Sequence, residues 1–182
     1  MLSSMVLSKT AALRGTAYNE PYPPAPAIEL QQGDGEPFQL SGQRGKIVLI
    51  FFGYTSCPDV CPTTLAELNA SLLQLGTRAD HVQVVLISVD PERDTSARMQ
   101  EYVERFNPSF IGLSGTPQEL ESIWESYGVF REVVPGSSST NYIVNHTART
   151  TLIDQQGKMR LSYGYQTPPE DIAYDLDRLL DQ

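Results

Sequence analysis

One unbroken apolar run at residues 47–52 constrains the fold more than any other feature of this 182-residue chain. It is aliphatic or aromatic throughout, which predicts a strand covered on both faces, as in a parallel or mixed sheet. The only two cysteines of the chain, Cys57 and Cys61, follow directly. Beyond them, leucines at three- and four-residue spacing predict an amphipathic helix at 62–75. Both sulfurs are therefore expected where a buried strand turns into a helix.

The remaining patterns alternate between strands and helices. A second buried strand is predicted at 82–89, and Thr95 is expected to cap the helix that follows it. Thr116 opens a capping box with Pro117 at the first helical position, and Thr167 opens a second capping box. The other expected elements are strands at 110–113 and 129–134, hairpins at 28–40 and 150–163, and a loop at 135–140. Because that loop is rich in Gly and Ser, we expect it to be mobile.

This order predicts an α/β protein with a thioredoxin-like fold: a central mixed sheet flanked by helices, with an N-terminal β-hairpin. Residues 27–182 are expected to form a single domain, and the proline-containing residues 1–26 an extended N-terminal arm or linker. Parallel strands present their carboxyl ends at one edge of a sheet, so Cys57 and the turn at Asp90 should be neighbours.

The charge balance argues against one class of partner. The chain has 13 Lys and Arg against 22 Asp and Glu, a formal net charge of −9. Without a basic cluster, such a chain is not expected to bind nucleic acid. It also lacks a run of ~20 apolar residues that could cross a bilayer, and its first seven residues are too short and polar for a signal peptide.

The cysteine pair points to thiol or metal chemistry. Cys61 is expected at a helix start, where the positive end of the helix dipole stabilises a thiolate. The pair could close a disulfide or hold one soft metal ion. Of the two histidines, His81 is expected to be solvated, whereas His146 ends a predicted strand and is expected to pass beside the thiols. Two thiolates and an imidazole suit cuprous copper, or zinc with a fourth ligand; the alternatives are inert buried cysteines and an ordinary loop histidine.

Three ordered blocks of sequence carry a family resemblance. They are residues 52–62, which include both cysteines, residues 90–95, and residues 144–147 around His146. Together they resemble the SCO/SenC family, and the resemblance runs from about residue 28 to the last helix. It implies a copper-binding metallochaperone with a thioredoxin fold that assists assembly of the dinuclear copper centre of cytochrome c oxidase. The ligands it implies for Cu(I) or Cu(II) are Cys57, Cys61 and His146.

The same resemblance implies partners and a location. The partners are the copper-receiving subunit of the oxidase and a second copper chaperone. The domain would stand at the extracytoplasmic face of a bacterial membrane, in the periplasm or outside the cell, or in the mitochondrial intermembrane space. A membrane tether is implied for the full-length protein and is absent from this chain. One departure is Asn145, where the family commonly has Asp; the site loses a negative charge that favours the more highly charged cupric ion.

The main alternative is a thiol-disulfide reductase that acts on the cysteines of the oxidase subunit. Cys57 would then be the attacking thiolate and Cys61 the resolving thiol, and the reaction would not need His146. The resemblance favours a copper chaperone over an enzyme. A peroxiredoxin-like peroxidase is disfavoured because Tyr54 stands where that class has Thr, and an adaptor with incidental thiols is the least specific alternative.

Other residues near the motifs have simpler interpretations. Asp59 and Asp90 could support the site or dock a partner, but Asp90 is expected chiefly to form a turn. Asp94 is expected, with Thr95, to cap a helix. The methionines do not cluster, so Met99 and Met159 are expected to be core or hairpin residues.

Overall fold

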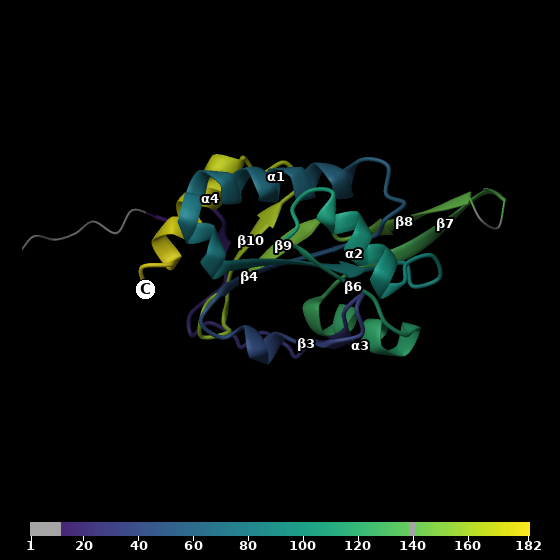
Figure 1. Ribbon diagram of the computed structural model, residues 1–182, viewed down its shortest axis with the longest axis horizontal. Helices are drawn as coiled ribbons and strands as arrows, with labels where there is room; N and C mark the ends of the chain where they lie inside the picture. Colours follow the sequence, from purple (N-terminus) through teal and green to yellow (C-terminus); the bar gives the residue numbers. More distant parts are fainter. Residues whose placement is uncertain (1–11, 139–140) are drawn as a thin grey trace, which may run out of the picture.

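The computed structural model of the chain describes residues 12–138 and 141–182 (Figure 1). Its centre is a six-stranded mixed sheet, in which β4, β5 and β6 are parallel and the other pairings are antiparallel. In order across the sheet, the strands are β1 (Thr16–Ala17), β10 (Met159–Gly164), β9 (Arg149–Ile153), β4 (Ile47–Gly53), β5 (Val82–Ser88) and β6 (Ile111–Leu113). The predicted α/β fold with a central mixed sheet is confirmed.

The two central strands are the most completely covered part of the molecule. All seven residues of β4 and all seven of β5 are buried, as their apolar sequences predict. The strands pair in parallel from Ile47 beside Val82 to Gly53 beside Ser88. Both therefore end at the same edge of the sheet, and the chain leaves β4 there to enter the cysteine motif.

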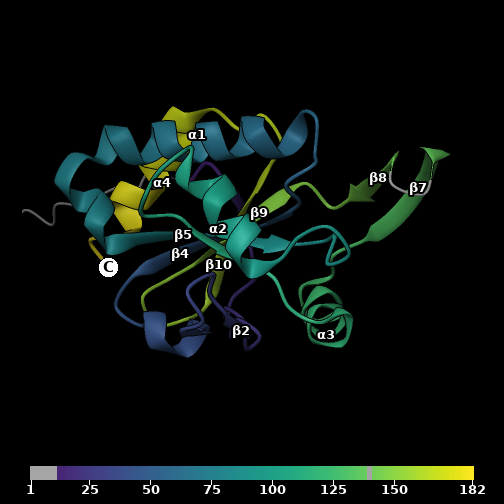
Figure 2. The ribbon, with the colours of Figure 1, turned by 45° about the vertical axis from the view of Figure 1, so that its right-hand side comes forward.

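Helices cover the two faces of the sheet (Figures 1 and 2). Helices α1 (Val60–Leu75) and α4 (Pro169–Leu179) pack side by side on one face. The opposite face carries α3 (Pro117–Tyr127) and the predicted N-terminal hairpin of β2 (Glu29–Gln31) and β3 (Pro37–Gln39). Helix α2 (Ser96–Glu104) lies against β6, and short 3-10 helices occupy Leu40–Gln43 and Gly76–His81.

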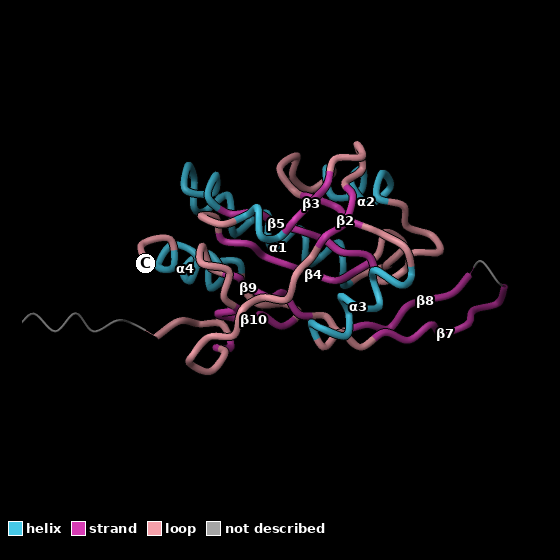
Figure 3. The backbone as a smooth tube through the Cα atoms, turned by 90° about the horizontal axis from the view of Figure 1, so that it is seen from below, coloured by secondary structure: helices cyan, strands magenta, loops and turns pink. Residues whose placement is uncertain are grey.

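A second hairpin, β7 (Arg131–Ser138) with β8 (Asn141–His146), forms a two-stranded sheet of its own and extends beyond the central sheet (Figures 1 and 3). The sequence places a loop at 135–140, and this is wrong for the described part. β7 continues through Pro135, which pairs with Tyr142, to Ser138, with a shift in register between them. Proline is tolerated there because an edge strand need not donate every N–H group. Residues 139–140 lie outside the described residues, so the mobility of the loop stays a prediction.

Helix ends follow the sequence signals with two exceptions. Thr95 caps α2 and Thr116 forms the capping box of α3, as predicted. Helix α1 begins at Val60, two residues before the predicted start, because proline is tolerated throughout the first turn, where N–H groups have no partner within the helix. The predicted capping box at Thr167 is wrong: its hydroxyl donates to the Gly164 carbonyl instead, at 2.8 Å.

The described part of the N-terminal segment is fixed to the edge of the sheet. Its strand β1 pairs with β10. The amide groups of Arg14 and Gly15 both donate to the buried carboxylate of Asp175 on α4, each at 2.8 Å. Within the described residues, no helix has both the length and the apolar content needed to cross a membrane.

The contact between α2 and β6 gives a test of the packing. A Cβ atom added at Gly112 in β6 would lie 2.4 Å from backbone atoms of Met99 in α2, which cannot move aside alone. We expect Gly112→Ala to lower the free energy of unfolding by about 2–3 kcal/mol through overpacking. Gly164→Ala is the matched control, because that strand glycine has no atom within 4 Å of the added group. Chemical denaturation of both variants measures the difference, and equal midpoints would contradict the close packing of α2 on β6.

Candidate metal and thiol site

Three side chains with soft or borderline metal-ligand atoms meet at the edge where β4 ends. Cys57 lies in the turn after β4, Cys61 in the first turn of α1, and His146 at the end of β8. Their ligand atoms all lie within 4.8 Å of one another, and Cys61 Sγ is 3.7 Å from His146 Nε2. The structure thus brings together the three residues that the sequence singles out.

The two thiols have unequal surroundings. Cys61 is fully buried beneath the start of α1, whereas Cys57 is half-buried and faces an open cavity. The Cys61 amide, in the first turn of the helix, donates to Cys57 Sγ at 3.3 Å. A first-turn N–H group has no partner within the helix, so it is available to stabilise negative charge on this sulfur.

These contacts make Cys57 the thiolate of the pair. The pKa of Cys57 is lowered to about 4, first by the hydrogen bond from the Cys61 thiol and further by His146 and backbone amides, against the opposing effect of burial. The pKa of Cys61 is raised well above its usual value, because its thiol donates to the Cys57 thiolate and because it is buried. At neutral pH the pair therefore carries one proton, on Cys61, and one negative charge, on Cys57.

His146 is oriented with one nitrogen towards the sulfurs. Its Nδ1 lies 3.1 Å from the Thr147 carbonyl oxygen. A carbonyl can only accept, so Nδ1 carries a proton and donates to that carbonyl, and Nε2 faces the sulfurs. The rings of Phe51 and Tyr54 meet the imidazole edge to face, at centroid distances of 6.2 and 5.8 Å. The hydrogen bond at Nδ1 and the ring packing therefore leave Nε2 as the nitrogen that could bind a metal ion.

Tyr54 connects the turn that carries Cys57 to β8, the strand that carries His146. Its hydroxyl accepts a hydrogen bond from the Val144 amide in β8, at 3.2 Å. Burial raises the pKa of Tyr54, so the hydroxyl is neutral at physiological pH. No local pattern in the sequence indicates this role, although Tyr54 lies inside the cysteine motif; only the long-range hydrogen bond to β8 reveals it.

Asp94 supports the turn before Cys57, and the prediction that it caps a helix is wrong. Thr95 alone caps α2, by accepting from the Arg98 amide at 3.2 Å. The buried Asp94 carboxylate instead accepts from the amide and hydroxyl of Thr55, and from the Ser88 hydroxyl. Burial raises the pKa of Asp94. Through its hydrogen bonds to Thr55 and Ser88, the carboxylate connects the cysteine turn to the end of β5.

Neither Asp59 nor Asp90 belongs to the close-set group of metal-ligand atoms, although the Asp59 backbone forms a hydrogen bond with Cys57. Asp90 is fully buried. Besides lying in the turn that was predicted for it, its side chain contacts Tyr142 and Arg93. Asp59 is exposed at the start of α1 and forms no side-chain cap. Asn145 is exposed, and its amide group donates to Glu132 at 3.2 Å. It precedes His146 in the sequence and lines the same cavity.

His81, Met99 and Met159 also lie outside the site. His81 is exposed at the end of a 3-10 helix, as predicted. Met99 is buried in the core. Met159 is half-buried and packs against the core cluster, so both residues agree with the sequence-based interpretation.

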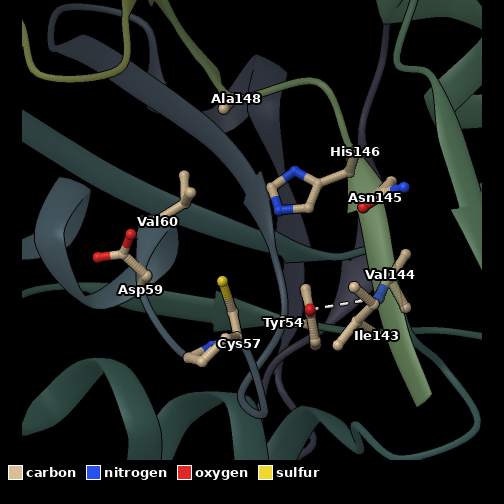
Figure 4. A pocket seen from close by; sticks show the side chains of 10 residues that line it. Tyr54, Cys57, Asp59, Val60, Ile143, Val144, Asn145, His146 and Ala148 are labelled. Atoms are coloured by element: carbon tan, nitrogen blue, oxygen red, sulfur yellow. Dashed lines mark hydrogen bonds between the residues drawn. The ribbon is translucent and has the colours of Figure 1, made fainter. Parts of the chain in front are cut away.

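The site opens into a cavity of about 420 Å³ (Figure 4). Cys57 and His146 face this hollow from opposite sides, and Tyr54 lies between them. Apolar side chains complete much of its wall, namely those of Pro58, Val60, Ile143, Val144 and Ala148. A partner molecule can therefore reach Cys57 and His146, while Cys61 remains beneath them.

Comparison with known proteins identifies close relatives. The model of the SCO1/SenC family matches residues 17–181. A SCO2-like protein of Rickettsia felis is 36% identical over 80% of this chain and 71% of its own length. The mouse mitochondrial SCO2 homolog is 33% identical over 93% of this chain and 66% of its own length. Among solved structures, Bradyrhizobium japonicum ScoI with copper bound is 41% identical, with a TM-score of 0.79 over 86% of this chain and 99% of that one.

The unequal thiols lead to a prediction about pH. Because the pKa of Cys57 is lowered, its thiolate is present above about pH 4 and is lost only as the pH falls through that value. We expect the rate of Cys57 alkylation by iodoacetamide to be nearly constant from pH 6 to 8. For a thiol of ordinary pKa, ~8.5, the rate would rise roughly 80-fold over that range. Mass spectrometry of the quenched protein assigns the modified residue and measures the rate.

The Cys61→Ala variant is the control for this measurement. It removes the thiol whose hydrogen bond contributes most to the low pKa of Cys57. The alkylation rate of Cys57 in this variant should rise with pH within the same range. A wild-type rate that climbs like that of an ordinary thiol would show that the first turn of α1 does not stabilise the thiolate.

Proposed function

The chain belongs to the SCO1/SenC family, and we propose that it is a copper-binding metallochaperone whose ligands are Cys57, Cys61 and His146. One observation carries this proposal: two sulfurs and one imidazole nitrogen lie within 4.8 Å of one another, beside a cavity that Cys57 and His146 line. Nothing more than small side-chain adjustments is needed for the three atoms to bind one ion.

The chemistry of these donors suits copper. Thiolates are soft ligands that favour Cu(I), and an imidazole extends the set towards Cu(II), which prefers nitrogen donors. The Cys57 thiolate is already formed at neutral pH, so only the Cys61 proton has to leave when the metal binds. A copper-bound ScoI among the similar structures supports the same choice of metal.

We further propose that the copper is cargo for cytochrome c oxidase. The family resemblance suggests assembly of the dinuclear copper centre, with delivery to the copper-receiving subunit and supply by another copper chaperone. The half-exposed Cys57 and His146 at the cavity mouth would let a partner's ligands approach the ion. The extracytoplasmic face of a membrane is the proposed location, in line with the mitochondrial relative from mouse.

A thiol-disulfide reductase is the second candidate function, and the unequal thiols favour it. The Cys57 thiolate would attack a substrate disulfide and form a mixed disulfide while one substrate thiolate leaves. Cys61, after losing its proton, would then attack Cys57 Sγ and release the second substrate thiolate. The products are a Cys57–Cys61 disulfide and a reduced substrate, so this reaction uses the same two sulfurs as the metal.

The variant His146→Ala separates the two functions. It removes the only nitrogen donor of the set, so we expect affinity for Cu(II) to fall about 100-fold, while Cu(I) remains bound by two thiolates with a smaller loss. Reduction of a disulfide substrate should change little, because the Cys61 amide and thiol still stabilise the Cys57 thiolate. Competition titrations with both copper ions and a reductase assay provide the measurements.

His81→Ala is the matched control, because it removes the other histidine, which is exposed and remote from the sulfurs. It should behave like the wild type in every assay. If a His146→Ala protein binds both ions normally but no longer reduces disulfides, the reductase becomes the first candidate function and the copper chaperone the second.

Oxidation supplies an independent test of the sulfur ligands. A Cys57–Cys61 disulfide consumes both thiolates, so the oxidised protein should bind less than a tenth of the copper bound by the reduced form. Free-thiol titration and metal analysis of the same samples give the two quantities. One equivalent of tightly bound copper on a protein without free thiols would refute the ligand assignment.

A further inference from the structure

Tyr142 makes a partly buried hydrogen bond that the proposed copper ligands do not explain. It lies on β8, four residues before His146. Its hydroxyl donates to Asp90 Oδ1 at 2.6 Å, and the Asp90 side chain is fully buried. Burial and this hydrogen bond raise the pKa of Tyr142 to about 12, so the hydroxyl remains a donor throughout the physiological range.

Arg93 reinforces the same contact from a second direction. Its guanidinium forms an ion pair with Asp90, and its Nη1 donates to the Tyr142 carbonyl at 3.0 Å. The guanidinium also stacks on the Tyr142 ring, 3.7 Å from its centroid, and lies 5.6 Å from the Tyr54 ring. Asp90 and Arg93 both belong to the turn after β5, so this cluster joins that turn to β8.

The position of the contact along β8 matters for His146. Side chains at alternate positions share one face of a strand, so Tyr142, Val144 and His146 all point towards the domain. Tyr142 is held by Asp90 and Arg93, and the Val144 amide is held by the Tyr54 hydroxyl. These are anchors of a hairpin that projects from the central sheet, and an isolated two-stranded hairpin is only marginally stable.

We propose that Tyr142, through Asp90 and Arg93, is a positioning residue that holds β8 where His146 reaches the two sulfurs. The inference rests on the proposed copper site and adds a determinant of its selectivity. Tyr142 does not bind the ion itself in this proposal, because its hydroxyl is engaged by Asp90. Its effect is to raise the fraction of molecules in which the imidazole is in place.

The fraction of molecules with the imidazole in place determines the apparent affinity for copper. When only part of a population is competent to bind, the apparent dissociation constant is the intrinsic one divided by the competent fraction. Cu(II), which depends on the imidazole, should respond to the loss of the anchor. Cu(I), which two thiolates can hold, should respond much less.

Tyr142→Phe tests the proposal with little disturbance, since it removes the hydroxyl and keeps the ring on which Arg93 stacks. We expect the affinity for Cu(II) to fall about tenfold, the range reached when partners that orient a ligand are lost. The affinity for Cu(I) should stay within about twofold. In the metal-free protein, the Val144 amide should exchange with solvent at least several-fold faster, because β8 is less firmly attached.

Tyr163→Phe is the matched control. Tyr163 is a buried tyrosine of β10 whose hydroxyl likewise donates to a buried aspartate, Asp175, at 3.2 Å. Its hydrogen bond joins β10 to α4, and β10 belongs to the central sheet rather than to the hairpin of β7 and β8. This variant should leave both copper affinities and the exchange of the Val144 amide unchanged.

The exchange measurement separates this inference from the copper proposal. If the wild type fails to use His146 for copper, faster exchange at Val144 in Tyr142→Phe would still support Tyr142 as the residue that places β8. Unchanged exchange, or an equal loss of affinity for Cu(I) and Cu(II), would overturn the positioning role.

Discussion

The parallel pairing of β4 with β5 is the constraint on which the site depends. Fourteen buried residues form this pair, and it ends with Gly53 beside Ser88. The Val89 amide donates to the Gly53 carbonyl at 2.8 Å, which carries the pairing one step beyond the strands. The cysteine turn and the turn of Asp90 and Asp94 therefore start side by side. Without this shared edge, neither the Thr55–Asp94 hydrogen bonds nor the contact of Asp90 with β8 could form.

Gly53 shows how little room that edge leaves. A Cβ atom at this position would come within 2.8 Å of Cys61 Sγ, so the absence of a side chain lets the buried sulfur lie against the strand. The first turn of α1 then brings its amide to Cys57. Cys57 Sγ is charged and accessible, whereas Cys61 Sγ is protonated and buried. The course of the backbone at Gly53 and in the first turn of α1 produces this difference. Both proposed chemistries start from this arrangement.

Much of the fold and the cysteine pair could be predicted from the sequence because their signals are local, whereas His146 was expected beside the thiols only from the predicted fold and the family resemblance. The apolar runs of β4 and β5, the Thr116 capping box and the spacing of the cysteines each depend on neighbouring residues.

The features that were misassigned depend on residues far apart in the sequence. The Asp94–Thr95 pair has the composition of a helix cap, yet Asp94 bonds to Thr55, 39 positions earlier. The residues from Pro135 to Ser138 have a loop-like composition, but pairing with β8 holds them in a strand. Tyr54 and Tyr142 were missed for the same reason, since their partners are apparent only in three dimensions.

The origin of the three donors bears on how a cargo ion could be both held and released. The two sulfurs are four residues apart and fixed by the edge of the sheet and by α1, whereas the imidazole belongs to a separate hairpin. In the proposed role, that division would let the imidazole withdraw through a small movement of β8 while the thiolates kept the ion. A partner entering the cavity beside Ile143 and Ala148 would meet Cys57 and His146 first and Cys61 last. Ligand exchange could then proceed one donor at a time, with the buried sulfur as the final attachment. The hydrogen bonds that fix the hairpin would therefore govern the start of release, although none of them touches the ion.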